Sequence, residues 1–423
     1  MWRQPWGYKE GWAICIGLFI TGAVLQLTAG KVDPTLFRYP LNAITGGLFL
    51  FFLIMVYVAS RKAAALQWFY SLTASITSLT AWMVLVIIMG LTRQVAPSVT
   101  VTHGGLLSGL GFMQMTLSWP FMLLFLYFLS VLGLVTVRKV AHFRKKDIPF
   151  ILNHAGLFIT LLAAILGNGD LQRMRMTVPL EQPEWRATNE IGEMKELPLA
   201  IELKSFTIDE YPPKLLAIDN TTGNALPENN PENMLVEETP LSGSLLDWEV
   251  EVIRSLPMAA CVHGKDTVNF VEFHSEGATS AVFVRVRNKK DGVEKSGWVS
   301  CGSFMFPYVS LQLNDEISLV MPGREPKRFA SEVSVYTQDK KQADALIEVN
   351  KPFSIAGWKI YQLSYDETKG KWSTVSVFEL VRDPWLPVVY AGILMLLLGS
   401  VCLFIQAPGN KEEEAAVNDT KTE

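Results

Sequence analysis

The sequence is poor in charge and in cysteine, and it lacks several signatures of catalysis. Only 18% of its 423 residues are charged, and it has four cysteines. No two of them form a Cys-x-x-Cys pair, which excludes the usual thiol–disulfide exchange motif, and without Cys-x-x-Cys-His the chain has no motif for covalent haem attachment. The signatures of P-loop ATPases, His-Glu-x-x-His metalloproteases and Gly-x-Ser-x-Gly hydrolases are also missing. The sequence therefore predicts no catalytic residue.

Basic residues are outnumbered by acidic ones in the long segment between the fifth and sixth hydrophobic runs. Residues 168–384 hold 23 Lys and Arg against 33 Asp and Glu, whereas the rest of the chain holds 14 against 8. Nucleic-acid backbones are bound by clustered cations. An acidic segment of this size therefore argues against a nucleic acid as partner.

Long hydrophobic runs are the dominant feature that is present. Mean hydropathy is +0.24, and 49% of the residues are hydrophobic. A helix needs roughly 20 apolar residues to cross a bilayer. Six stretches approach this length, at about 12–29, 40–60, 72–91, 117–137, 150–167 and 386–405. The first has no small-residue cleavage site and further runs follow closely, so we expect a membrane span and not a cleaved signal peptide.

The distribution of Lys and Arg predicts how these spans are oriented. Most basic residues outside 168–384 occupy alternate connections, namely Arg3, Lys9, Arg61, Lys62, Arg138, Lys139, Arg144, Lys145 and Lys146. The intervening connections hold Lys31, Arg38 and Arg93. Because cytoplasmic loops are enriched in Lys and Arg, we expect both termini in the cytoplasm and residues 168–384 outside it.

Residues 168–384 carry a second pattern, in which apolar and polar residues alternate. The runs are LAIELKSFTI, SLLDWEVEVI, NFVEFHS, SAVFVRVRN, ISLVM, SEVSVYT, WKIYQLSYD and STVSVFEL. Period-two runs rich in β-branched and aromatic residues predict strands, and many short strands predict a sandwich or barrel. The expected fold is an α-helical polytopic membrane protein of about six spans with one large extracytoplasmic, mainly β domain.

The domain organisation follows from these two patterns. The predicted parts are four spans and a basic cytoplasmic loop in 1–149, a fifth span at 150–167, the β domain at 168–384, a sixth span at 385–406 and an acidic cytoplasmic tail at 407–423. The tail is expected to be disordered, because it is rich in charge and poor in large apolar residues.

The four cysteines divide between the two kinds of sequence. Cys15 and Cys402 fall in predicted spans and are expected to be packing residues. Cys261 and Cys301 fall in the predicted outer domain, where an oxidising compartment permits a disulfide. Two buried thiols are the alternative, and the sequence leaves both open.

Histidines offer the best candidates for a binding site, and one lies inside a hydrophobic run. We expect His142, His263 and His274 to be solvated or structural. His103 lies between the third and fourth spans, before a glycine-rich stretch that permits close approach to a ligand, although a structural role is favoured there too.

His154 lies about one turn into the fifth span, in IPFILNHAGLFITLLAAILGNGD. Ionisable residues in spans are unfavourable without a partner and mark functional sites by default. A neutral imidazole is a good axial ligand for haem iron. The competing interpretation is a histidine bonded to a neighbouring helix or reaching the cytoplasmic interface. The residues alone do not decide between the two.

Four segments resemble one known family. NHAGLFITLLAAILGNGD is similar to the opening of the ResB-type (CcsB-like) core of bacterial System II cytochrome c biogenesis. LPLAIELKSFTIDEYPPKLLAID resembles its first outer strands, KPFSIAGWKIYQLSYDE its late segment, and VRDPWLPVVYAGILMLLLG its entry into the last span. The four occur in the family's order and bracket residues 150–405, with a less familiar middle at about 222–330.

The resemblance implies a role in haem handling. ResB-type proteins of the bacterial inner membrane work with a CcsA-type membrane subunit, and the pair exports haem and presents it for thioether attachment to apocytochrome c. On this basis His154 is an axial ligand of a transient, non-covalent haem b, and the CcsA-type partner supplies the second ligand. The chain is then an accessory subunit of a haem lyase, and its other partners are apocytochrome c and membrane lipid.

This sequence departs from the family pattern in two ways. It lacks the Trp-rich motif of the CcsA-type partner, so that half is not encoded in this chain. Four spans also precede the fifth, more than the compact family form has. A membrane-anchored scaffold or sensor that binds no haem is the alternative function. A transporter is less favoured, since no two spans at corresponding positions are broken by Gly or Pro.

Overall fold

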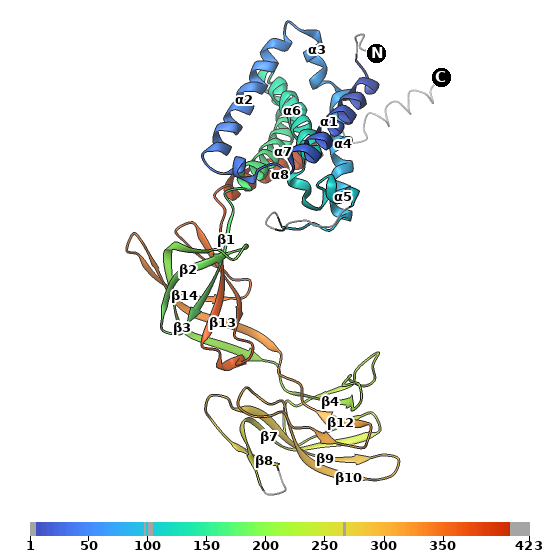
Figure 1. Ribbon diagram of the computed structural model, residues 1–423, viewed down its shortest axis with the longest axis vertical. Coiled ribbons are helices and arrows are strands. Elements are labelled where there is room, and N and C mark those ends of the chain that lie inside the picture. Colours follow the sequence, from blue (N-terminus) through green and yellow to red (C-terminus); the bar gives the residue numbers. More distant parts are fainter. Residues whose placement is uncertain (1–5, 97–98, 100–104, 265–267, 407–423) are drawn as a thin grey trace, which may run out of the picture. The chain divides into compact units, whose positions relative to one another are not determined.

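The computed structural model describes residues 6–96, 99, 105–264 and 268–406. It divides the chain into two compact units (Figure 1). One comprises Met1–Gln172 with Arg382–Glu423, and the other comprises Arg173–Val381. The boundaries predicted for the β domain, 168–384, lie within five residues of the division. His103 and the tail at 407–423 lie outside the described residues.

The first unit is helical. Its long helices are α1 (Tyr8–Ala29), α2 (Leu41–Ser60), α4 (Leu72–Leu91), α6 (Trp119–Ala141), α7 (Ile148–Gly167) and α8 (Leu386–Gln406), and its short ones are α3 (Ala64–Gln67) and α5 (Leu106–Gly109). All six long helices are long and apolar enough to cross a membrane. The prediction of about six spans is therefore confirmed, and the predicted limits differ from the observed ones by at most four residues.

Helix α6 forms the centre of this bundle. In its most apolar 18-residue window 67% of the residues are buried, against 11–28% in the other five spans. It contacts α1, α2, α4 and α7. Aromatic rings fill one side of it, where Trp82 of α4 stacks on Phe128 of α6 with ring centroids 5.0 Å apart. Such pairs add to the burial of their own area.

Helices α7 and α8 pack closely because glycines face each other. A Cβ built on Gly156 of α7 would lie 2.6 Å from the carbonyl oxygen of Gly392 and from the backbone nitrogen of Leu396, both in α8. One built on Gly399 would lie 2.6 Å from the backbone nitrogen of Asn153. Small residues permit this approach of two backbones within a membrane.

The second unit is built from strands, as predicted. They are β1 (Gln172–Pro179), β2 (Pro183–Asn189), β3 (Met194–Glu210), β4 (Lys214–Asp219), β5 (Asn233–Leu235), β6 (Leu241–Leu245), β7 (Trp248–His263), β8 (Val268–Glu272), β9 (Thr279–Asn288), β10 (Glu294–Ser300), β11 (Leu311–Gln312), β12 (Ile317–Val320), β13 (Pro326–Thr337), β14 (Gln342–Glu348), β15 (Phe353–Ile355), β16 (Trp358–Tyr365) and β17 (Val375–Arg382).

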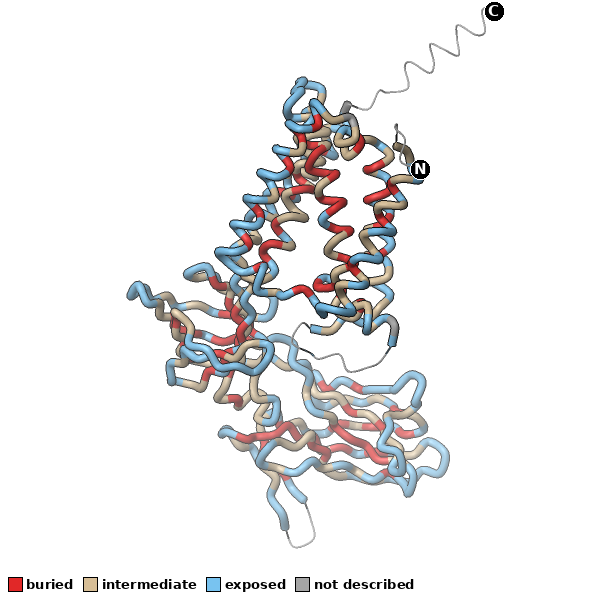
Figure 2. Tube along the Cα trace, turned by 45° about the horizontal axis from the view of Figure 1, so that its top comes forward, coloured by how far each residue is buried: buried red, intermediate tan, exposed pale blue. Residues whose placement is uncertain are grey.

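These strands form three sheets, two of which share a core. An eight-stranded sheet has the order β14-β13-β3-β2-β1-β17-β16-β15 and a core of its own that includes Met176, Trp358 and Phe378. A five-stranded sheet (β10-β9-β7-β6, with β8 on β7) shares another core with a four-stranded sheet (β11-β12-β4-β5). Buried positions recur along the strands of all three (Figure 2). The predicted strand-rich domain thus contains a large sheet and a two-sheet sandwich.

One predicted strand is interrupted. The run SLLDWEVEVI alternates like a single strand, yet β6 ends at Leu245 and β7 begins at Trp248. Leu246 has a φ of 51° in the turn between them, and its backbone N–H donates to the Glu232 carboxylate at 2.8 Å. That acceptor lies 14 residues away in the sequence, so the local alternation gave no sign of the turn.

Candidate functional site

His154 lies on α7 with one ring nitrogen engaged and the other available. Its Nδ1 lies 3.0 Å from the backbone oxygen of Phe150, one turn earlier. A carbonyl oxygen only accepts, so Nδ1 carries the proton and Nε2 keeps a lone pair. Within the described part of the chain, no residue bonds Nε2. The half-buried ring also stacks on the Phe150 ring, with centroids 3.7 Å apart and planes 17° apart.

The face of α7 that carries His154 is the one turned toward the bundle. Residues four apart share a helix face, so His154 lies above Phe158. Phe158 is buried and stacks on Phe49 of α2, with centroids 6.4 Å apart. Gly156, which meets α8, is about half a turn away from His154 around the helix. The imidazole therefore lies on the same packed face of α7 as Phe158, one turn closer to the start of the helix.

Three cations lie over aromatic rings at the end of the bundle where α6 ends and α7 begins, and we call this the basic end. It is defined by the contacts of Arg61 with Tyr57, of Arg138 with Tyr70 and of Lys139 with Phe150, whose charged groups lie 5.6, 4.8 and 5.2 Å from the ring centroids. Tyr57 Oη also lies 3.4 Å from His142 Nδ1, which joins the ends of α2 and α6.

Lys139 has a second partner at the basic end. Its Nζ donates to Asp147 Oδ1 at 2.9 Å, across the connection between α6 and α7. Asp147 is nearly buried, with 12% of its side chain exposed, whereas 42% of the Lys139 side chain is exposed. The cation is therefore held in place and still reachable.

A polar cluster at the opposite end of the bundle ties three helices together. Asp170 accepts hydrogen bonds from the Tyr39 backbone N–H at 2.8 Å, from Asn42 Nδ2 at 2.6 Å and from Trp385 Nε1 at 2.8 Å. Burial opposes ionisation of this carboxyl, but the three hydrogen bonds outweigh it and lower the pKa of Asp170. The cluster was not predicted, although Asn42 inside an apolar run was a signal for it.

The two cysteines of the β unit are free thiols. They are not joined to each other in this structure, and both are partly buried and not fully buried as the second alternative expected. Cys261 is paired across the strands with Phe270, and its Sγ lies 3.8 Å from His263 Nδ1. The Sγ of Cys301 lies 3.5 Å from Thr279 Oγ1. Each sulfur thus packs among neighbours of its own.

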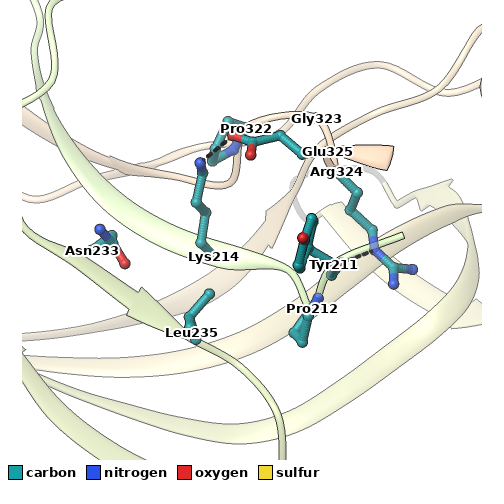
Figure 3. A pocket seen from close by; sticks show the side chains of 9 residues that line it. All are labelled: Tyr211, Pro212, Lys214, Asn233, Leu235, Pro322, Gly323, Arg324 and Glu325. Atoms are coloured by element: carbon teal, nitrogen blue, oxygen red, sulfur yellow. Dashed lines mark hydrogen bonds and ion pairs between the residues drawn. The ribbon is translucent and has the colours of Figure 1, made fainter. Parts of the chain in front are cut away.

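The β unit also has a pocket of about 230 Å³ beside the connection from β3 to β4 (Figure 3). Tyr211, Pro212, Leu235 and Pro322 give it an apolar lining. Its cations are neutralised, since Lys214 Nζ lies 2.6 Å from a Glu325 oxygen, and Arg324 Nη1 lies 3.1 Å from Glu210 Oε2. The pocket therefore lacks a free charge that would attract an anion.

No cluster of three or more His, Cys, Asp or Glu side chains suits a metal ion in the parts of the chain that the structure describes. A lone histidine such as His154 fits a metal whose other ligands come from elsewhere. Iron in a porphyrin is of this kind, because the macrocycle supplies four nitrogens and the protein supplies axial ligands.

Comparison with known proteins gives one family match. Residues 275–377, from just before β9 into β17, match the model of the ResB-like family. No curated protein matches the chain. The match confirms the resemblance predicted from the sequence motifs, and it includes KPFSIAGWKIYQLSYDE and part of the less familiar middle.

Proposed function

We propose that this ResB-type chain acts in cytochrome c biogenesis by holding haem through His154, for attachment to apocytochrome c together with a CcsA-type membrane subunit. The observation that carries the proposal is the state of the imidazole. Its Nδ1 is fixed by the Phe150 carbonyl, and its Nε2 has a lone pair. Metal-binding histidines are commonly oriented in this way, by a bond from the ring nitrogen that does not bind the metal.

The surroundings of His154 suit haem as a transient cargo. The ring is half-buried in an apolar helix, where the alternative to a ligand is an unsatisfied polar group. His154 would supply one ligand to the iron, and the partner would supply the second.

The orientation proposed for the membrane follows from the charge. The basic end is placed in the cytoplasm and the β unit outside, in the compartment where cytochromes c mature. Haem then meets His154 near the cytoplasmic surface, because His154 lies one turn from Phe150 and Lys139 contacts that same ring.

The chain's own contribution to thioether formation is positional. Bound haem supplies the vinyl groups that react with apocytochrome thiols, and the protein supplies orientation and ligation. In this proposal His154 binds the iron and takes no part in making the thioether bonds. We therefore assign this chain as an accessory subunit of the haem lyase.

The test compares His154→Ala with Asn153→Ala in the complex with the partner. Asn153 is the matched control because it is a polar residue in the same turn, bonded to Ser400 Oγ at 2.8 Å. His154→Ala should reduce haem per folded complex about tenfold or more and abolish cytochrome c maturation, while Asn153→Ala should keep both. Added imidazole should restore part of the haem, because it occupies the vacated coordination position.

Full haem occupancy in folded His154→Ala would refute the ligand assignment. A wild-type complex that carries no haem at all would instead favour a membrane-anchored scaffold or sensor. Absorbance in the Soret region, measured against protein concentration, distinguishes these outcomes.

A further inference from the structure

The side chains next to His154 form a continuous series of contacts that ends at a cation. His154 stacks on Phe150 with centroids 3.7 Å apart, and Lys139 Nζ lies 5.2 Å from the centroid of the same ring. Asp147 holds that ammonium at 2.9 Å. One aromatic ring thus separates the candidate iron ligand from a positioned, partly exposed positive charge.

The ammonium of Lys139 has capacity for another acceptor. It has three N–H donors, and Asp147 Oδ1 receives one. Phe150 contacts it through the ring face, which attracts a cation without using its hydrogen bonds. With 42% of the side chain exposed, a further oxygen can approach.

Haem b carries two propionate carboxylates on one edge of its ring, so it is an anion along that edge and apolar elsewhere. A carboxylate at the rim of a membrane is stabilised by a cation at the same depth. The side chain of a helical residue is directed toward the start of its helix, and for α7 this is the basic end. The edge of a porphyrin bound at His154 can therefore reach the side on which Lys139 lies.

We propose that Lys139 binds a propionate of the haem held by His154, and that Asp147 is a positioning residue for Lys139. This inference rests on the proposed function. It assigns the carboxylate edge of the porphyrin to the cytoplasmic side, and it makes the site selective for porphyrins with free carboxylates.

The alternative source of an anionic oxygen at Lys139 is the phosphate of a lipid headgroup, because juxtamembrane cations bind anionic lipids. Two ligands distinguish the sources. Haem and haem dimethyl ester share the iron, the ring and the vinyl groups, but the ester has no carboxylate charge. Nanodiscs of phosphatidylcholine alone remove anionic lipid from the comparison.

The experiment titrates the haem-stripped complex of this chain and its partner with each compound in such nanodiscs. Lys139→Gln should weaken haem binding about tenfold, the effect of losing one charge-assisted hydrogen bond. It should leave the affinity for the dimethyl ester unchanged, which also shows that the variant is folded. Lys139→Arg should retain most of the affinity for haem.

Arg138→Gln is the matched control, because Arg138 is the neighbouring cation of α6 but lies over Tyr70, 4.8 Å from its centroid. This variant should bind both compounds as the wild type does. Asp147→Asn should weaken haem binding less than Lys139→Gln, because the cation remains.

Three results would overturn the inference. Equal haem affinity in Lys139→Gln and the wild type would rule out the contact between Lys139 and a propionate. An equal loss for haem and its ester shows that Lys139 acts through the structure, and an effect that appears only after anionic lipid is added assigns the cation to lipid. A wild-type complex that binds neither haem nor its ester would overturn the proposed function as well. This result differs from the three above, in all of which the wild-type complex binds haem.

Discussion

At the scale of single residues, the polar side chains at the two ends of α7 differ in how completely they are hydrogen-bonded. His154 has one nitrogen satisfied within its own helix and one without a partner in the described structure. Asp170 has both carboxylate oxygens bonded, by three groups from two segments far apart in the sequence. An unsatisfied polar atom in an apolar region suits a ligand, whereas a fully bonded one suits a structural tie.

The first prediction concerns Asp170→Asn. This change replaces the carboxylate that accepts three hydrogen bonds with a neutral amide. It should destabilise the helical unit by about 1–3 kcal/mol. Haem per folded complex should be unchanged, because the residue lies at the end opposite His154. Thermal unfolding in detergent, followed together with haem absorbance, provides the measurement.

The lowered pKa of Asp170 also fixes the sign of its pH dependence. The carboxyl ionises more readily in the folded state than in the unfolded one, so its stabilisation is present above about pH 4 and decreases as the pH falls through the folded pKa. Asp170→Asn should lose this acid-dependent component. An unfolding temperature that is the same in wild type and variant at pH 7 would contradict the structural role.

At the scale of elements, the packing of α7 against α8 decides which face of α7 is left for His154. Gly156 lies against Gly392, and Gly399 lies against Asn153. These contacts direct one face of α7 to α8 and leave the face with His154 and Phe158 toward the other helices. The position of the imidazole therefore depends on glycines on the far side of its own helix.

The second prediction tests this dependence with Gly156→Val. The new Cβ would meet the Gly392 oxygen and the Leu396 nitrogen at 2.6 Å, and both are backbone atoms that cannot turn aside. Overpacking of this kind costs about 1–3 kcal/mol or more, so the yield of folded protein should fall and haem binding should weaken. Fluorescence-detected size exclusion and the Soret absorbance measure the two effects.

Gly47→Ala on α2 is the control for that substitution. A Cβ built on Gly47 has no heavy atom within 4 Å, so the change should be tolerated. A Gly156→Val protein with wild-type yield and haem content would show that the α7–α8 contact is looser than the structure describes.

At the scale of the whole molecule, charge and pattern divide the chain in the same way. The helical unit contains the six apolar helices and the basic connections, and the β unit contains most of the acidic residues. In membrane proteins, the loops rich in Lys and Arg tend to lie in the cytoplasm. The division also agrees with a family match that lies wholly inside the β unit.

The third prediction is the orientation that this division implies. Reporter fusions placed after Gly30, at Val140 and at Asn224 should report outside, inside and outside, respectively. The reason is that five basic residues lie around Val140, whereas the connection after Gly30 has only Lys31 and Arg38. An inside signal at Asn224 would be incompatible with a β unit that meets secreted apocytochrome c.

The sequence by itself was sufficient to predict the six spans and the division of the chain into a helical part and a strand-rich part. A span needs about 20 apolar residues and a half-buried strand alternates with period two, so both are properties of consecutive residues. This is why the limits of the six spans, and of most of the eight runs predicted as strands, were close to those observed, although several of the 17 strands were not predicted. The exception, SLLDWEVEVI, was interrupted by a bond to Glu232 from outside the run.

The tertiary structure alone decided how the polar residues are partnered. The sequence pointed to His154 but could not choose between a ligand and a bonded side chain, and it gave no reason to associate Asp170 with Asn42 or Lys139 with Phe150. Membrane spans are apolar on nearly every side, so their sequences do not reveal which faces meet. The close approach of α7 and α8 at glycines and the aromatic packing around α6 fix those faces. Only then does a lone imidazole acquire a free nitrogen, a stacked ring and a cation beside it.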